Sequence, residues 1–204
     1  FEGPRATART LMKEGDTIFV ALSWTEHPAP QTYEEAYDRL VWTAHHWQHW
    51  LDHGTFPDHP WRTHLQRSAL TLKGLSYEPT GALVAAATSS LPETPGGERN
   101  WDYRYTWMRD ATFTLQALHW LNLDWEADEF MQFVADVEAN EDGALQIMYG
   151  IDGRRDLTES TRDDLSGYEG ARPVRIGNGA YDQKQNDVFG AVLDSILLHT
   201  RRSQ

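Results

Sequence analysis

Apolar side chains that recur at three- and four-residue steps are the feature that most constrains the fold of this chain. Between residues 32 and 51 they are Tyr33, Tyr37, Leu40, Ala44, Trp47 and Leu51. Thr32, just before this run, and Glu35, three residues later, have the spacing of a capping box. In a capping box the two side chains satisfy free backbone N–H groups at the helix start. The pattern predicts a long amphipathic helix over residues 32–51.

The same rhythm predicts four further helices. The second begins near residues 58–61 and runs towards Gly74, the third covers 107–121, the fourth 125–139 and the fifth 182–200. Their buried faces are predicted to carry Ala111, Leu115, Leu118 and Leu121, then Phe130, Val134 and Val137, and finally Val188, Val192, Ile196 and Leu197. A mainly α protein follows.

Two segments have strand character. Residues 16–24 are rich in β-branched and aromatic side chains, which predicts a strand. A lone strand cannot satisfy its own backbone, and no strong partner lies nearby, so we expect it to belong to a preceding sheet. For residues 81–88 periodicity does not separate strand from helix, and we favour an extended segment. Pro28 and Pro30 mark a linker between the first strand and the first helix.

Charge and composition narrow the classes of partner. The formal net charge of −13 makes nucleic acid and anionic membranes poor candidate partners, because like charges repel. The absence of cysteine excludes disulfides, thiolate nucleophiles and Cys-type zinc sites, and favours a reducing compartment. The longest apolar run, residues 82–87, is far shorter than the roughly 20 residues of a membrane span, and the first residues lack a signal-peptide layout. We expect a soluble, cytoplasmic protein with a neutral or cationic ligand.

Residues 96–110, GGERNWDYRYTWMRD, hold four aromatic rings, three arginines and three carboxylates directly before an apolar helical pattern. A pyranose presents apolar C–H faces and a rim of hydroxyls, so rings and charged hydrogen-bonding groups suit it together. The nine tryptophans of the chain exceed what a core of this size requires. The run indicates a sugar-binding pocket, the alternative being a helix–helix core rich in large rings.

Three segments together resemble glycoside hydrolase family 15, which holds glucoamylases, glucodextranases and actinobacterial trehalases. They are residues 90–93 (SLPE), residues 96–110, and residues 167–178 (GYEGARPVRIGN). The resemblance covers most of residues 60–200 in family order. Residues 67–75 (RSALTLKGL) look most like the trehalase branch.

This resemblance implies an (α/α)6 toroid that follows a β-sandwich, with sugar bound in the mouth of the barrel. Residues 1–24 would be the tail of the sandwich and its last strand, 25–57 a linker helix region, and 58–204 the N-terminal part of the catalytic barrel. About twelve helices averaging roughly 11 to 12 residues, with their connections, do not fit into 204 residues. The chain therefore looks like a fragment of a partial toroid.

The implied activity is inverting hydrolysis of an α-glucosidic bond, with trehalose converted to glucose. The alternatives are a glucoamylase-type exo-hydrolase of malto-oligosaccharides and a non-catalytic carbohydrate-binding fragment. Inverting glycosidases use a general acid and a general base about 6.5 to 9.5 Å apart. The resemblance implies that the acid lies beyond residue 204, in an Ile-Trp-Glu-like motif, and the base further on. The expected partners are a small neutral sugar, the missing remainder of the catalytic domain and, as an open option, further copies of the chain.

The resemblance also assigns roles to single residues. Tyr103 and Trp107 match positions that line the subsite of the terminal glucose, and Arg109 and Asp110 match the pair that hydrogen-bonds its far hydroxyls. A guanidinium only donates and a carboxylate only accepts, so together they hold hydroxyls that do both. The alternatives are that Asp110 stabilises a helix N-terminus with Arg109 as its surface partner, and that the two rings are ordinary core.

Arg172 and Arg175, in the third matching segment, either face the cleft or tie their loop to neighbouring acids. The trehalases of this branch look phosphate-dependent as a group, so the resemblance implies phosphate and magnesium as cofactors. The two arginines would be suitable partners for the phosphate. His45, His49 and His53 recur every four residues as metal ligands can. His46 stands where a zinc protease would have its glutamate, so a solvated or packed helix face is favoured there over a metal site.

Overall fold

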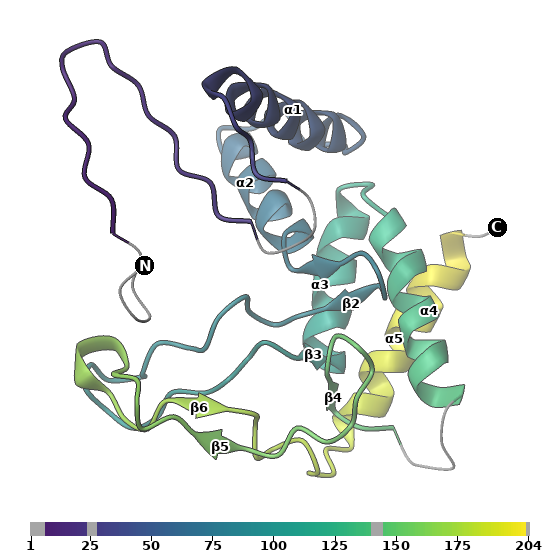
Figure 1. Cartoon of the computed structure of the whole chain (residues 1–204). Helices are drawn as coiled ribbons and strands as arrows, with labels where there is room; N and C mark the ends of the chain where they lie inside the picture. The colour runs from purple at the N-terminus through teal and green to yellow at the C-terminus, as the bar shows by residue number, and fades with distance from the viewer. Residues whose placement is uncertain (1–6, 24–27, 140–144, 203–204) are drawn as a thin grey trace. The chain divides into compact units, whose positions relative to one another are not determined.

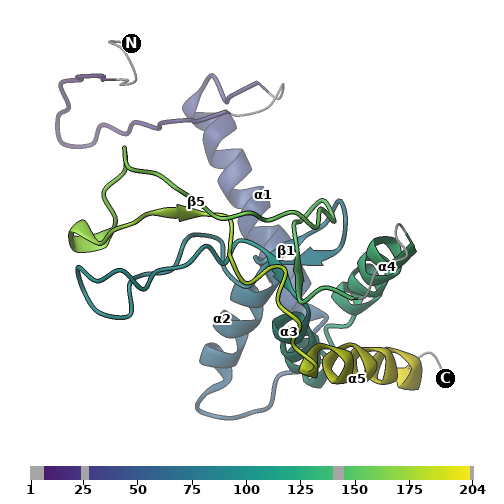
Figure 2. The same cartoon turned by 90° about the horizontal axis from the view of Figure 1, so that it is seen from below.

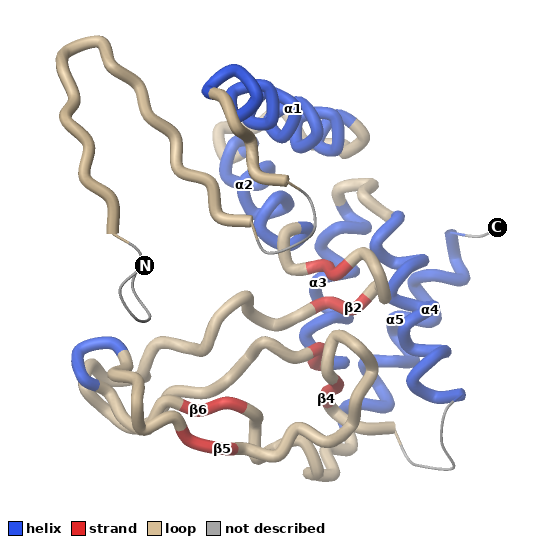
Figure 3. Tube along the Cα trace, viewed as in Figure 1, coloured by secondary structure: helices blue, strands red, loops and turns tan. Residues whose placement is uncertain are grey.

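A computed structural model of the chain describes residues 7–23, 28–139 and 145–202. The chain divides into two compact units, Phe1–Trp50 and Leu51–Gln204. Over the described residues it is mainly helical, with strands of only two residues and long loops between them (Figure 3). The helices are α1 (Tyr33–Asp52), α2 (Arg62–Lys73), α3 (Met108–Trp120), α4 (Trp125–Ala139) and α5 (Asp187–Arg202), with a short 3-10 helix at Tyr168–Gly170. The strands are β1 (Ser76–Tyr77), β2 (Ala82–Leu83), β3 (Thr106–Trp107), β4 (Met148–Tyr149), β5 (Ser160–Thr161) and β6 (Arg175–Ile176).

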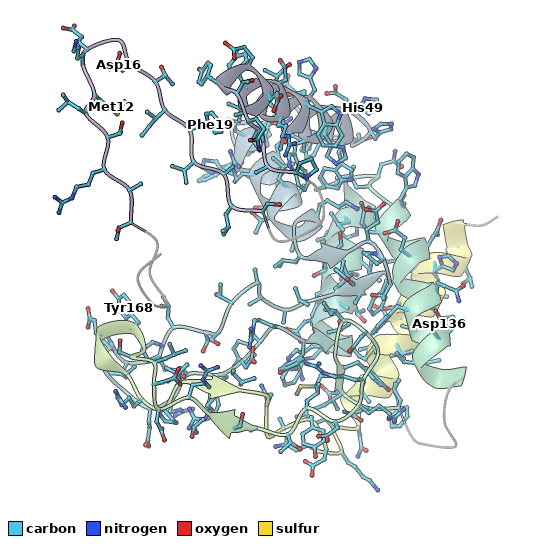
Figure 4. The ribbon with its side chains drawn as sticks, viewed as in Figure 1. Met12, Asp16, Phe19, His49, Asp136 and Tyr168 are labelled. Carbon is cyan, nitrogen blue, oxygen red and sulfur yellow. The ribbon has the colours of Figure 1, made fainter. Side chains whose placement is uncertain are left out.

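In the first unit, α1 begins where the capping box predicts. The Thr32 Oγ1 accepts a hydrogen bond from the backbone N–H of Glu35 at 3.2 Å. The Glu35 carboxylate accepts one from the backbone N–H of Gln31 at 2.7 Å. The first bond satisfies a donor that a helix start leaves free, and the second joins the Glu35 side chain to the residue before Thr32. The predicted helix is confirmed. His49 lies on this helix (Figure 4), and among the described residues no group of three or more His, Cys, Asp or Glu could hold a metal ion.

The predicted strand over residues 16–24 is wrong for its described part, 16–23. There the chain is extended but pairs with no strand, as the path through Met12, Asp16 and Phe19 shows in Figure 4. It reverses direction at a turn in which Asp16 N–H donates to the Lys13 carbonyl at 3.0 Å. Strand propensity reflects packing on a sheet, and no described strand offers this segment a ladder. Trp24 lies outside the described residues.

In the second unit, α3, α4 and α5 lie side by side (Figures 1 and 2). They enclose the core with the short strands β2 and β4. The core consists mainly of Ala82, Leu83, Tyr105, Met108, Ala111, Leu115, Ala127, Phe130, Phe133, Val134, Val137, Ile147, Met148, Tyr149, Leu157 and Val188. The predicted helices of residues 58–74, 107–121 and 125–139 are confirmed, and so is the buried face of α4. Leu121, predicted to be buried, is half-buried at the end of α3.

The fifth helix differs from its prediction. It begins at Asp187 rather than Asp182, because residues 178–183 form turns in which Tyr181 and Gln183 donate to the Asn178 and Ala180 carbonyls. Val188 is buried, but Ile196 and Leu197 are 38 % and 46 % exposed, so the predicted buried face is only partly correct. None of the helices within the described ranges is both long and apolar enough to cross a membrane.

Antiparallel pairs of two-residue strands position the loops around the core. β3 pairs with β4, with Thr106 opposite Tyr149, and this holds the start of α3 against the core. β5 pairs with β6 and stiffens the long loop between β4 and α5. Residues 81–88 contain β2 and no helix, so the extended segment favoured there is confirmed.

Candidate functional site

The ring-rich run lies on an extended stretch before α3. The carbonyls of Trp101, Tyr103 and Tyr105 accept hydrogen bonds from the backbone N–H groups of Ser90, Ala86 and Ala85 at 2.7, 3.0 and 3.0 Å. Alternate side chains of an extended chain point to the same side. Trp101, Tyr103 and Trp107 follow this alternation and line a common surface, whereas Tyr105, which has the same spacing, is buried in the core.

The structure brings the four predicted sugar-binding residues together. A first hollow of about 320 Å³ is lined by Ala85, Tyr103, Trp107, Arg109 and Asp110. The rings of Tyr103 and Trp107 meet edge to face, with centroids 6.3 Å apart. The hollow therefore combines an aromatic wall with an adjoining cation and anion, and its volume is within the range of small-ligand pockets.

Arg109 contacts carboxylates on two helices. Its Nη1 lies 2.9 Å from Oδ2 of Asp187, the first residue of α5, and its Nε lies 3.9 Å from Oδ2 of Asp110. All three side chains are about half exposed. Asp187 was missed by the sequence reasoning, because only the packing of α5 on α3 brings it to Arg109.

A second hollow of about 390 Å³ shares the rings of Tyr103 and Trp107 with the first. It is lined by Trp101, Tyr103, Trp107, Glu159, Asn178, Gly179, Ala180 and Gln183. The Trp107 Nε1 is buried and, within the described part of the chain, has no hydrogen-bond partner. A buried donor left unpaired is costly in free energy, and this one belongs to a ring that lines both hollows. Glu159, Asn178 and Gln183 were also missed, although Asn178 belongs to the matching segment 167–178.

Arg172 and Arg175 line neither hollow. The Arg175 Nε lies 2.9 Å from Oε1 of Glu159, and its Nη1 donates to the carbonyls of Glu98 and Asn100 at 2.8 and 2.9 Å. Its guanidinium also lies 4.7 Å from the centre of the Trp101 ring. The exposed Arg172 makes a longer contact, 3.4 Å, to the Asp163 carbonyl. Arg175 therefore ties its loop to the ring-rich run.

Asp102, one of the carboxylates of that run, is completely buried. Its two oxygens accept from the Arg104 Nε and Nη2 at 2.8 and 2.7 Å. Burial alone would raise the pKa of Asp102, but the hydrogen bonds from Arg104 and its charge outweigh this, and the pKa lies below its ordinary value. Burial and the neighbouring Asp102 charge raise the pKa of Tyr105.

Comparison with known proteins places the chain in a family. The profile of glycosyl hydrolases family 15 matches residues 60–203. The chain is 62 % identical over 203 residues to a protein named trehalase from Mycobacterium tuberculosis, with 98 % of this chain and 30 % of that protein covered. A trehalase from Mycolicibacterium smegmatis is 61 % identical with the same coverage. One from Thermoplasma volcanium is 42 % identical over 199 residues, or 91 % of this chain and 32 % of that one.

No solved structure matches the chain. It spans about 30 % of the length of the mycobacterial relatives. The family profile nevertheless covers more than half of the chain and contains the segments that build both hollows. On this evidence the chain belongs to glycoside hydrolase family 15.

Proposed function

We propose that this chain supplies the part of a trehalose-hydrolysing enzyme that binds the terminal glucose. The observation that carries the proposal is the shared first hollow of Tyr103, Trp107, Arg109 and Asp110. The relatives named trehalase, at up to 62 % identity, support trehalose as the substrate. Residues 58–204 would form the N-terminal part of an (α/α)6 toroid, after a sandwich tail at 1–24 and a linker helix region at 25–57.

The chemistry of the first hollow suits a neutral hexose. The Tyr103 and Trp107 rings offer apolar surface to the C–H face of the sugar. Arg109 donates to hydroxyl oxygens and Asp110 accepts from hydroxyl hydrogens. Since the two charges oppose each other, the hollow needs no charged ligand.

The cleavage chemistry is proposed to lie outside residues 1–204, where the general acid and the general base of inverting hydrolysis would be found. Among the described residues that line the second hollow, Glu159 is the only carboxylate. Its Oε1 lies 2.9 Å from the Arg175 Nε, and its Oε2 accepts from the Gly179 N–H at 3.3 Å. Both oxygens are thus already hydrogen-bonded inside the protein, which supports a structural role for Glu159.

Isothermal titration of the purified chain with trehalose tests the proposal. We expect measurable binding, weakened at least about tenfold by Asp110→Asn, which removes a charged acceptor. Asp152→Asn is the matched control, since Asp152 is a partly exposed aspartate that lines neither hollow. Equal affinity of wild type and Asp110→Asn would reject the proposal, and stronger binding of maltotriose than of trehalose would favour the malto-oligosaccharide alternative.

A further inference from the structure

Asp102 is buried beside the second hollow but does not line it. Beyond the two bonds from the Arg104 side chain, Oδ1 accepts from the Arg104 backbone N–H at 3.2 Å. Oδ2 accepts from the Tyr105 hydroxyl at 3.3 Å and from the Gly177 backbone N–H at 3.2 Å. The Asp102 backbone carbonyl accepts from the Asn178 Nδ2 at 3.1 Å. One residue therefore holds together two segments that are 75 positions apart in the sequence.

Each of these two segments supplies a wall of the second hollow. Trp101 and Tyr103, the direct neighbours of Asp102, line one wall, and Asn178 and Gly179, which follow Gly177, line the other. We propose that Asp102 is a positioning residue that sets the separation of these walls through its bonds to Arg104, Gly177 and Asn178. The proposal deepens the proposed function, on which it rests, by adding the second hollow to the sugar-binding surface.

At Gly177 the second wall packs closely against residues 157–158. Its φ is +86°, and a Cβ at this position would lie 2.2 Å from the Thr158 carbonyl oxygen. Only glycine combines this conformation with so little space. The next residue, Asn178, donates its backbone N–H to the Leu157 carbonyl at 2.9 Å. The wall is thus clamped between Asp102 on one side and residues 157–158 on the other.

The chemistry of Asp102 fits a fixed support rather than a ligand contact. Its carboxylate receives a bidentate, charge-assisted pair from Arg104, the most directional ion pair available to proteins. Bonds from Tyr105 and Gly177 occupy its remaining acceptor capacity. The Asn178 amide is engaged by the Asp102 carbonyl and the Ala180 N–H. A sugar in the second hollow would therefore meet the Gln183 side chain and the rings of Trp101, Tyr103 and Trp107, which suit hydroxyls and a C–H face.

The chain provides a matched control for this pair. Arg162 donates to Asp164 with the same two-residue spacing and the same geometry, Nε to Oδ1 at 2.8 Å and Nη2 to Oδ2 at 2.7 Å. This second pair is exposed and lines neither hollow. Asp164→Asn therefore removes the same chemical groups as Asp102→Asn without touching the walls.

The test is amide hydrogen exchange and the indole N–H resonances of the ¹⁵N-labelled chain, followed by titration with trehalose. In Asp102→Asn we expect the Gly177 amide to exchange at least tenfold faster, the Trp101 indole resonance to shift, and the affinity for trehalose to fall about tenfold. The amide of Leu115 in α3 should exchange as in wild type. Asp164→Asn should leave all four readouts unchanged.

Unchanged exchange at Gly177 with an unchanged Trp101 resonance would overturn the proposal. Equal acceleration at Gly177 and Leu115 would also overturn it, because Asp102 would then support the fold in general. If Asp102→Asn does not fold, Arg104→Lys takes its place, since it keeps the charge and loses the planar fork. If wild type binds no trehalose, the proposed function fails, while the Gly177 and Trp101 readouts still decide the role of Asp102.

Discussion

At the scale of single residues, carboxylates that look alike in the sequence differ in burial and contacts in the structure. Asp102 and Asp110 both belong to the ring-rich run, eight positions apart. Asp102 is fully buried and saturated by internal donors, whereas the Asp110 side chain is 48 % exposed in the first hollow. An exposed ion pair such as Arg109–Asp110 stabilises a fold by only about 0–1 kcal/mol. Asp110 also lies in the first turn of α3, where a carboxylate stabilises the helix N-terminus by a similarly small amount. Its place in the first hollow agrees with a ligand-binding role.

The Arg162–Asp164 pair gives a prediction of pH dependence at this scale. Hydrogen bonds from Arg162 lower the pKa of Asp164 to about 2. Because the folded value lies below the unfolded value of about 3.9, the pair contributes fully above the unfolded value. That contribution disappears as the pH falls through about 2. A carboxyl ¹³C NMR titration should give a midpoint near 2 for Asp164, and Arg162→Gln should return it towards 3.9. A midpoint near 3.9 in wild type would contradict the pairing.

At the scale of elements, local sequence accounts for most helices and for little of the loops. Helices α1 and α4 follow the prediction because periodicity and first-turn residues are local signals. The start of α5 was placed too early, since the turns at 178–183 depend on contacts within the loop. Residues 16–23 have strand composition but pair with no strand within the described ranges, and composition does not reveal whether a partner is present.

The two hollows also differ in how far the sequence predicts their residues. Tyr103, Trp107, Arg109 and Asp110 could be proposed together because they lie within eight consecutive residues. Glu159 and Gln183 reach the second hollow from distant loops, so no spacing rule relates them to the rings. Their position depends on Asp102, Gly177 and the β5–β6 hairpin, which are tertiary features.

The turn between β1 and β2 offers a prediction at the element scale. Gly81 has φ +77°, and a Cβ there would lie 2.1 Å from the Glu129 carbonyl oxygen of α4. We expect Gly81→Ala to lower the free energy of unfolding by about 3 kcal/mol or more, from backbone strain and from displacement of α4. Gly170→Ala is the control, with φ +76° but no atom within 4 Å, and should cost only about 1–2 kcal/mol. Urea unfolding followed by circular dichroism compares them, and equal losses would show that the turn does not press on α4.

At the scale of the whole molecule, the chain spans only about 30 % of the relatives named trehalase, yet contains both hollows. Binding of the sugar and cleavage of its bond are therefore predicted separately for this chain. Inverting cleavage needs two carboxyl groups about 6.5 to 9.5 Å apart, a separation that leaves room for a water between the general base and the sugar. In the described part of the two hollows the carboxylates are Asp110, beside Arg109, and Glu159, bonded to Arg175. Neither is placed as a free acid opposite a free base.

We accordingly predict that the purified chain binds trehalose and releases no glucose. Glucose is measured by a coupled assay at trehalose concentrations that saturate binding, between pH 4 and pH 8, because a raised or lowered pKa could move an optimum within this range. The Mycobacterium tuberculosis trehalase, at equal molar concentration, is the positive control. Glucose release by the chain that Glu159→Gln abolishes would contradict the prediction and make Glu159 part of the cleavage machinery. Release that Glu159→Gln and Asp110→Asn both leave unchanged would point to a contaminating hydrolase. Binding without release would assign this chain to recognition, since its hollows would then hold the sugar without the groups that break its bond.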